Sequence, residues 1–351
     1  RLGVNAGDSI ASGGNYNVVV GDEAGTALTT GDNSVAVGYA ALSAVSSNSG
    51  NTAVGKDALR LTTGSQNTAI GWSAMELNVN GSYSVAVGDF ALYNQNPATA
   101  TNMYNVAVGK DAGLSVTTGT LNTIVGGLAG DAINSGTANT LFGYKAGSAI
   151  TTADGNTAFG KDALELNTSG VNTAFGGNAL AAVTSGTSNT AVGQDALTAN
   201  TASRNTAVGA LALTANTGGD NNTAVGENAG TANTDGHNNT FIGQDAGEAN
   251  TTGNYNTAVG SDALSTQVAG GASNTAIGYN VLAANTLGDN NTAVGKGAMN
   301  VNTEASNNTA IGFNALTTNL TDEGNTAIGS YALTTSNGGH SNTAVGNGAL
   351  N

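Results

Sequence analysis

The sequence predicts an all-β fold, a parallel β-solenoid (β-roll) of about twenty coils with one coil per 17-residue repeat. Three observations support this prediction. The pattern Asn-Thr-Ala-Val-Gly-x-x-Ala-Leu recurs along the chain, and its glycine appears 21 times, with 14 of the 20 spacings equal to 17 residues. Glycine accounts for 53 of 351 residues and aromatic residues for only 5%. The apolar content comes mainly from Ala, Val and Leu, so the core must be thin and built from small side chains.

Each repeat contains one predicted strand, directly before the glycine. The residue three before the glycine is Thr in 16 of 20 repeats and Val in the others, and the residue one before it is always apolar. These two positions share one face of a strand, while the residue between them, usually Ala, points to the opposite face. Because both faces are apolar, we expect one to be covered within the coil and the other by a second chain, which predicts an oligomer.

Polar and glycine positions of the repeat predict the turns. Asn lies four residues before the glycine in 18 of 20 repeats, as expected where a side chain bonds local backbone and stacks on its copy one coil away. The repeat glycine ends the strand, where a positive φ or a close backbone approach is needed. A second glycine, as at Gly64 or Gly253, marks the opposite turn.

A covariation between two positions of the repeat predicts a specific contact. The residue four after the glycine is Leu or Met in 14 repeats and Gly in seven. The central strand residue is larger than Ala in only four coils, and each of these has Gly at the Leu position of its own coil and of the preceding coil. The four enlarged residues are Val19, Ile124, Leu141 and Phe241. A larger side chain would fill the space left by two missing leucines, so consecutive repeats are expected to stack.

The repeat covers the whole chain, so we interpret residues 1–351 as a single repeat domain, an excerpt of a longer fibre protein. A coil rise of about 4.7 Å gives a predicted rod on the order of 95 Å long. One coil carries extra residues, and an insertion loop is expected over residues 89–105. A single helical turn in each Ala-Leu segment is the alternative, although Gly, Asn and Thr leave little room for it.

Composition disfavours several classes of function. The formal charge is −15, from 8 Lys plus Arg against 23 Asp plus Glu, which disfavours nucleic acid and anionic membrane surfaces as partners. There is no cysteine, and no apolar stretch is long enough for a membrane span or a signal peptide. His237 and His340 lie six coils apart, and no acid, base and nucleophile converge, so we expect no enzyme activity and no cofactor.

Two forms of the repeat resemble known families. Asn33-Ser34-Val35-Ala36-Val37-Gly38 resembles the coil signature of trimeric autotransporter adhesin heads, which are trimers of parallel β-rolls, although their coils are nearer 14 residues than 17. The commoner form, as in Asn256-Thr257-Ala258-Val259-Gly260, is similar to repeats of phage and bacterial tail-fibre-like and surface proteins. The resemblance implies a homotrimeric, extracellular fibre at a cell surface or virion, and it assigns no binding residue.

Acidic residues recur two positions after the glycine and give a weak candidate metal site. A stacked row of carboxylates would offer oxygen ligands to Ca²⁺, and turn capping is the other interpretation. The row is interrupted by other residue types, and the glycine-rich motif of calcium-binding β-rolls is absent. The candidates are Asp57, Asp111, Asp162, Asp195, Asp245 and Asp262.

Aromatic residues supply the candidate binding positions. Tyr93 and Tyr104 lie in the insertion loop, and Trp72, the only tryptophan, follows Gly71 at a turn. Exposed aromatic rings stack on sugars or anchor protein contacts, although edge packing or an inserted loop without function would explain them too. A cell-surface glycan or protein receptor is the expected partner.

The leading functional hypothesis is a structural and adhesive fibre segment, a phage tail fibre or a bacterial adhesin shaft. One alternative is a self-polymerising extracellular filament. The other is a ligand-binding solenoid, for calcium-dependent glycan contact or for ice, since rows of Thr on a flat face can order water.

Overall fold

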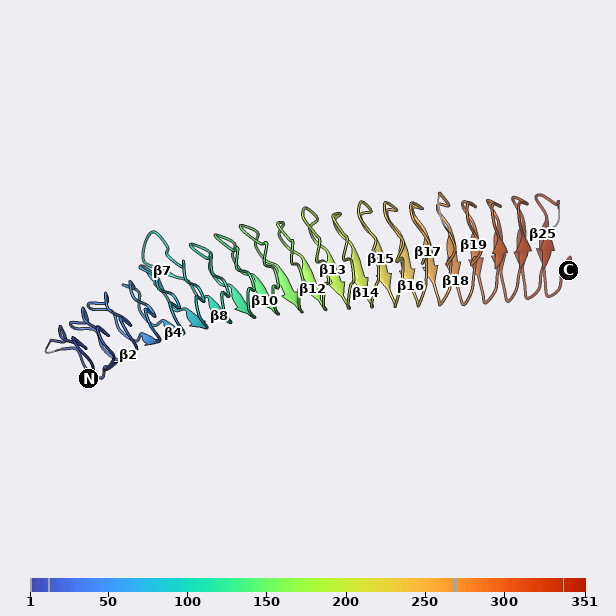
Figure 1. The fold of residues 1–351 in the computed structure, drawn as a ribbon. Helices are drawn as coiled ribbons and strands as arrows, with labels where there is room; N and C mark the ends of the chain where they lie inside the picture. Colours follow the sequence, from blue (N-terminus) through green and yellow to red (C-terminus); the bar gives the residue numbers. More distant parts are fainter. Residues whose placement is uncertain (1, 12, 268–269, 337) are drawn as a thin grey trace. The chain divides into compact units, whose positions relative to one another are not determined.

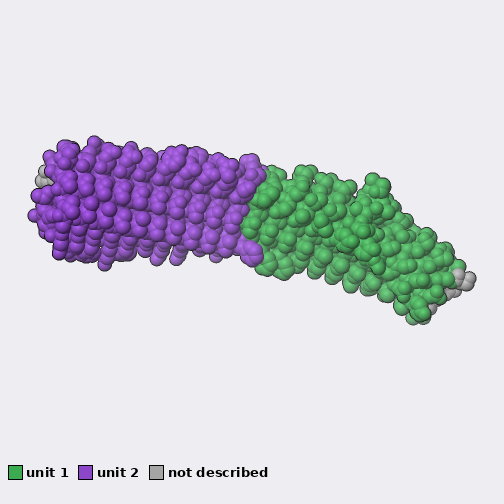
Figure 2. Space-filling model, turned by 180° about the vertical axis from the view of Figure 1, so that it is seen from behind, with its two compact units in different colours: residues 1–174 green, residues 175–351 purple. Residues whose placement is uncertain are grey.

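All regular structure in the described part of the chain is β. The computed structural model describes residues 2–11, 13–267, 270–336 and 338–351, and no helix occurs among them. The chain divides into two compact units, residues 1–174 and 175–351 (Figure 2). Both units consist of the same coil, with one three-residue strand per repeat (Figure 1). The helical alternative for the Ala-Leu segment is therefore wrong, and that segment forms turns.

In the first unit, three-residue strands pair in parallel from one coil to the next. Equivalent repeat positions face each other, so that Thr140 pairs with Thr157 and Leu141 with Ala158. The strands are β1 (Val18–Val20), β2 (Val35–Val37), β3 (Thr52–Val54), β4 (Thr68–Ile70), β6 (Val85–Val87), β8 (Val106–Val108), β9 (Thr123–Val125), β10 (Thr140–Phe142) and β11 (Thr157–Phe159), with β12 (Thr173–Phe175) at the unit boundary. A second, short parallel pair joins β5 (Gly81–Ser82) to β7 (Thr101–Asn102).

The second unit repeats this arrangement with ten strands in register. They are β13 (Thr190–Val192), β14 (Thr206–Val208), β15 (Thr223–Val225), β16 (Thr240–Ile242), β17 (Thr257–Val259), β18 (Thr275–Ile277), β19 (Thr292–Val294), β21 (Thr309–Ile311), β23 (Thr326–Ile328) and β25 (Thr343–Val345). A small parallel sheet contains β20 (Val301–Asn302), β22 (Thr318–Asn319) and β24 (Thr335–Ser336). The predicted parallel β-solenoid with a 17-residue coil is confirmed.

The interior of each coil is filled by the central strand residue and by the Ala-Leu segment. Ala224, Ala229 and Leu213 have no exposed surface, and equivalent residues are buried in coil after coil. The other two strand residues point outward and stay partly exposed, as for Ile242 at 39% and Ile277 at 40%. The chain thus covers one face of its strands and leaves the Thr-x-Val face open.

The contact predicted by the covariation is present in the structure. A Cβ atom at Gly230 would lie 2.6 Å from Cδ2 of Phe241, and one at Gly247 would overlap the same ring. Phe241, which is fully buried, therefore occupies the space above both glycines. The same geometry places Val19 against Gly25, Ile124 against Gly113, and Leu141 against Gly130 and Gly147.

Two columns of buried amides hold the turns. In the expected column, the backbone N–H of Asn239 donates to Oδ1 of Asn222 at 2.9 Å, and Nδ2 of Asn239 donates to the carbonyl of Gly253 at 2.8 Å. A second column lies seven residues after the repeat glycine, where Nδ2 of Asn233 donates to Oδ1 of Asn216 at 2.6 Å. This second column runs through most of the second unit, and we did not predict it from the sequence. Both columns are buried, so each bond is protected from water.

The repeat glycines form a third column in which backbones touch. Gly226 has a φ of 140°, and a Cβ atom there would overlap the carbonyl of Gly243 in the next coil. Only glycine permits both the backbone angle and this approach. The column explains why every repeat keeps this residue.

Candidate functional site

An aromatic patch lies on the surface of the first unit, over the turns that follow β3, β4 and β6. We name Lys56, Trp72, Phe90 and Tyr93 the first aromatic patch. The rings of Trp72 and Phe90 are 5.0 Å apart between centroids, and Phe90 meets Tyr93 edge-on at 5.6 Å. Nζ of Lys56 lies 5.5 Å from the centre of the Trp72 ring. Because Trp72 is 48% exposed, part of its ring is open to a ligand.

Ion pairs fix the charged side chains around this patch. Arg60 donates two hydrogen bonds to Oε1 of Glu76, at 2.9 Å from Nε and 2.6 Å from Nη2. Lys56 pairs with Asp57 at 2.9 Å, and the hydrogen bond that its ammonium group donates to that carboxylate raises the pKa of Lys56 above its ordinary value. The lysine charge is thus neutralised locally, and the patch offers mainly ring surface to a ligand.

The structure separates the three aromatic positions singled out in the sequence. Trp72 and Tyr93 both contact Phe90, so they belong to one patch. Tyr104 instead stacks on Tyr83, with 5.4 Å between ring centroids. Phe90 and Lys56 are the members that sequence reasoning missed. The available signal was the position of Lys56 and Trp72, each directly after the repeat glycine in consecutive coils.

The predicted insertion loop 89–105 is only partly a protrusion. Residues 98–100 are exposed, and the loop rises beside the label β7 in Figure 1. The loop then rejoins the wall, because Thr101–Asn102 pairs with Gly81–Ser82 and Met103 is fully buried. Only residues 98–100 protrude, and not the whole predicted loop. Met103 enters the core because burial of its apolar side chain stabilises the fold.

The six aspartates of the weak metal candidate lie at turn positions with a positive φ, between 55° and 57°. Short polar side chains tolerate this backbone conformation, which accounts for the recurrence of Asp and Asn there. Each carboxylate has a close partner, such as Lys110 for Asp111 at 2.5 Å or Asn178 for Asp195 at 2.8 Å. Among the described residues, no three His, Cys, Asp or Glu side chains form a group that could hold a metal ion.

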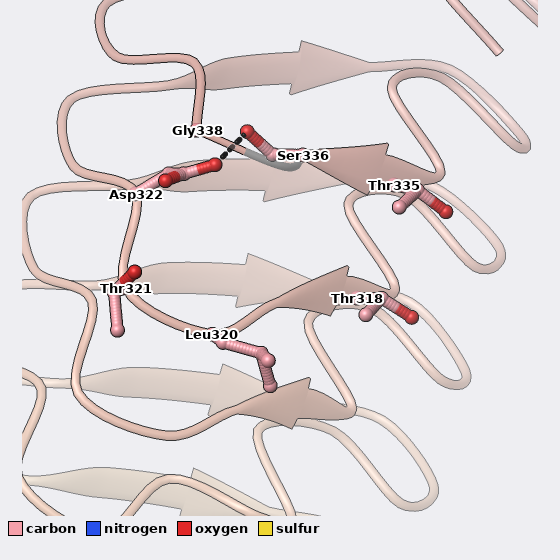
Figure 3. Close-up of a pocket in the computed structure, with 7 residues that line it drawn as sticks. All are labelled: Thr318, Leu320, Thr321, Asp322, Thr335, Ser336 and Gly338. Carbon is pink, nitrogen blue, oxygen red and sulfur yellow. Dashed lines mark hydrogen bonds between the residues drawn. The ribbon is translucent and has the colours of Figure 1, made fainter.

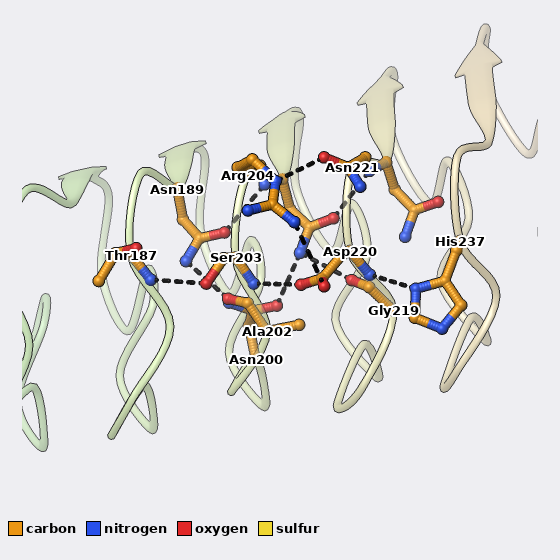
Figure 4. A network of polar contacts seen from close by, with 12 residues as sticks. Thr187, Asn189, Asn200, Ala202, Ser203, Arg204, Gly219, Asp220, Asn221 and His237 are labelled. Carbon is orange, nitrogen blue, oxygen red and sulfur yellow. Dashed lines mark hydrogen bonds and ion pairs between the residues drawn. The ribbon is translucent and has the colours of Figure 1, made fainter.

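A column of side-chain caps crosses the coils of the second unit, at the position six before the repeat glycine (Figure 4). The backbone N–H of Thr187 donates to Oγ of Ser203 at 3.1 Å, and that of Ser203 donates to Oδ1 of Asp220 at 2.7 Å. The N–H of Asp220 then donates to Nδ1 of His237 at 2.9 Å, and that of His237 to Oδ1 of Asn254 at 2.6 Å. Each coil therefore caps a free backbone donor of the coil before it.

Both histidines of the chain occupy this capping position. Nδ1 of His340 accepts from the backbone N–H of Glu323 at 3.1 Å, as Nδ1 of His237 accepts from Asp220. In each case Nδ1 acts as an acceptor, so the proton lies on Nε2. Their place in the repeat gives the histidines a structural role in the turns.

One surface cavity contains a buried carboxylate. It has a volume of about 290 Å³ and is lined by Thr318, Leu320, Thr321, Asp322, Thr335, Ser336 and Gly338 (Figure 3). Oδ2 of Asp322 accepts hydrogen bonds from Oγ of Ser336 at 2.6 Å and from the N–H of Gly339 at 3.1 Å. These bonds, that from Ser336 above all, lower the pKa of Asp322 below its ordinary value. The carboxylate thus holds the turn of the next coil together.

Parallel strands in register, one coil per repeat and columns of identical side chains define the class of this protein as a β-solenoid repeat protein. Comparison with known protein families, curated proteins and solved structures finds no match to this chain. The resemblance to adhesin heads and tail-fibre repeats therefore stands on the sequence motifs alone. Within the described residues, no helix has the length and apolar character to cross a bilayer.

Proposed function

We propose that this chain is a structural and adhesive segment of an extracellular fibre, on a phage tail or a bacterial surface, and that three copies assemble side by side. The observation that carries the proposal is the open Thr-x-Val face of the strands. In the second unit this face presents an apolar row that includes Ile242, Ile277 and Ile311, each close to 40% exposed. A partner with the same coil spacing can match such a row residue by residue, and a second copy of this chain has that spacing.

The interior columns support the mechanical part of the proposal. Backbone pairing, buried amides and glycine contacts link each coil to the next within both units, so a local opening must break several bonds at once. Such a wall resists bending and proteolysis. The adhesive part rests on the first aromatic patch, since partly exposed Trp and Tyr rings stack on sugars and anchor protein contacts.

The solution mass tests the assembly. Sedimentation equilibrium should give three chains of 34.0 kDa, about 102 kDa, at micromolar concentration. The double variant Ile242→Glu, Ile277→Glu places charge on the open face and should give monomers with an unchanged circular dichroism spectrum. Gln244→Glu, in the turn after β16, is the matched control and should leave the mass unchanged. A monomeric wild-type chain would contradict the trimer, and mass that keeps growing with concentration would favour an open filament.

Ice binding is the second candidate function, because one observation favours it. All ten strands of the second unit carry Thr three residues before the glycine, and these side chains lie on the same outward face as the Val and Ile row. A charge-free row of hydroxyl and methyl groups at the coil spacing suits an ordered water layer. Thermal hysteresis of the purified chain should then appear and should be lost in Thr240→Lys. Freezing at the equilibrium melting point would exclude this function.

A further inference from the structure

A second group of exposed rings and a lysine lies on the second unit, over the turns that follow β18, β19, β21 and β23. We name Tyr279, Lys296, Phe313 and Tyr331 the second aromatic patch. Nζ of Lys296 lies 5.5 Å from the centre of the Tyr279 ring, and Phe313 meets Tyr331 edge-on at 5.2 Å. The three rings are 52%, 41% and 42% exposed. None of them is needed to fill the core.

Three members of this patch repeat Lys56, Trp72 and Phe90 of the first patch, and its fourth member, Tyr279, corresponds to Tyr39 in the coil before Lys56. In four consecutive coils the first unit has Tyr39, Lys56, Trp72 and Phe90, and the second unit has the corresponding aromatic, lysine, aromatic and aromatic residues. The first three positions directly follow the repeat glycine, and the fourth lies one residue later. Tyr144 is the remaining ring directly after a repeat glycine, and most other coils have a small or polar residue there, such as Ser261 or Gln244, so the fold does not demand rings at this position.

The lysines show how selective this arrangement is. The chain has five lysines, and only Lys56 and Lys296 lie between aromatic residues at the same position of the coils before and after. Lys110 directly follows a repeat glycine too, but its neighbouring coils have Asp89 and Gly127 at that position. The same combination of one lysine and three aromatic residues thus occurs once in each unit. This recurrence indicates that both patches bind ligands of related chemistry.

The two patches differ in the charge available to a ligand. Lys56 is paired with Asp57, whereas Gly297 occupies the equivalent position beside Lys296. Within the described residues, Lys296 forms no salt bridge. Its ammonium group is therefore free to donate charge-assisted hydrogen bonds to an anion held against the rings.

We propose that the second aromatic patch binds an acidic saccharide, with sugar rings against Tyr279 and Phe313 and a sugar carboxylate on Nζ of Lys296. The C–H groups on a pyranose face are apolar and complement the negative face of an aromatic ring. The free ammonium selects a uronic-type sugar over a neutral one. The inference deepens the adhesive function proposed above and rests on it, and it assigns this unit its own ligand class.

The test is calorimetric titration of the full chain with a hexamer of galacturonic acid and with maltohexaose as the neutral probe. The acidic hexamer should bind saturably, and the neutral one at least tenfold more weakly. Lys296→Gln should weaken binding of the acidic hexamer about tenfold, and Phe313→Ala should weaken it further. Lys110→Gln, an exposed lysine without flanking rings, is the control and should bind as the wild type does.

Absence of saturable binding, equal binding of the two saccharides, or unchanged binding by Lys296→Gln would each overturn the inference. Circular dichroism shows whether Phe313→Ala is folded. If Phe313→Ala unfolds, the binding result for Lys296→Gln decides the test. Solution mass is measured on the same samples. A monomeric chain that binds the acidic hexamer would refute the trimeric fibre and leave this site intact, whereas a trimer that does not bind would refute the site alone.

Discussion

Phe241 offers the sharpest test of how the coils are packed. Its ring is fully buried and fills the space above Gly230 and Gly247. Both glycine N–H groups are held by 2.9 Å backbone bonds to the following coil, so the backbone has little freedom to collapse into a cavity. Phe241→Ala should therefore cost about 4–5 kcal/mol of unfolding free energy, the upper part of the range for such truncations.

A triple variant tests whether stability can be restored by the pairing of Ala with Leu found in the other coils. Adding Gly230→Leu and Gly247→Leu to Phe241→Ala recreates the common coil, in which Leu takes the same backbone conformation, as Leu264 does with a φ of 55°. This triple variant should recover most of the lost stability, less about 1–2 kcal/mol for each Leu placed at a positive φ. Gln244→Ala, in the exposed turn after the same strand, is the control and should change the unfolding free energy by less than about 0.5 kcal/mol.

Urea unfolding followed by far-ultraviolet circular dichroism measures these free energies. Amide hydrogen exchange at Gly230 and Gly247 reports whether the loss is local to the two coils. If Phe241→Ala cost less than about 1 kcal/mol, or if the triple variant were no more stable than the single one, the packing argument would be refuted.

Three further predictions concern the turns. Gly226→Ala should prevent correct stacking or destabilise the unit severely, because its Cβ would overlap the carbonyl of Gly243; a normal melting curve would contradict this. Asn239→Ala should cost about 1–3 kcal/mol in urea unfolding, since it leaves the buried N–H of Asn256 unpaired and removes one of the two amide hydrogen bonds to the carbonyl of Gly253, and a neutral effect would refute the ladder. The pKa of Asp322 is lowered in the folded state, chiefly by Ser336, so its stabilisation exists above the unfolded pKa and is lost as pH falls through the folded pKa. The difference in unfolding free energy between wild type and Asp322→Asn should accordingly shrink on acidification, and a constant difference would contradict the assigned role.

The fold could be predicted because each repeat serves as a comparison for the others. Gly230 and Gly247 replace the usual Leu in the two coils around Phe241, and this covariation predicted their contact from the sequence alone. The second amide column, which includes Asn216 and Asn233, recurs in most coils of the second unit and could have been found by the same comparison. It was missed because Ile, Leu or Val holds that position in much of the first unit, as at Ile133, so the column is polar in only part of the chain.

The candidate site was harder to predict, because it depends on side-chain direction and not on spacing alone. Lys56 lies over the ring of Trp72, in the following coil, whereas Lys296 lies over the ring of Tyr279, in the preceding coil. The repeat position of a lysine does not predict which of the two neighbouring rings it contacts. The same limit applies to Met103, whose place in an inserted segment suggested exposure but whose side chain enters the core.

The asparagine hydrogen bonds give the solenoid wall a direction along the chain. Asn51 accepts from the N–H of Asn67 and donates to the carbonyl of Gly64, so both of its partners come later in the sequence. Each coil therefore offers the following coil an acceptor and a donor from one side chain. The two directions along the wall are chemically different for this reason.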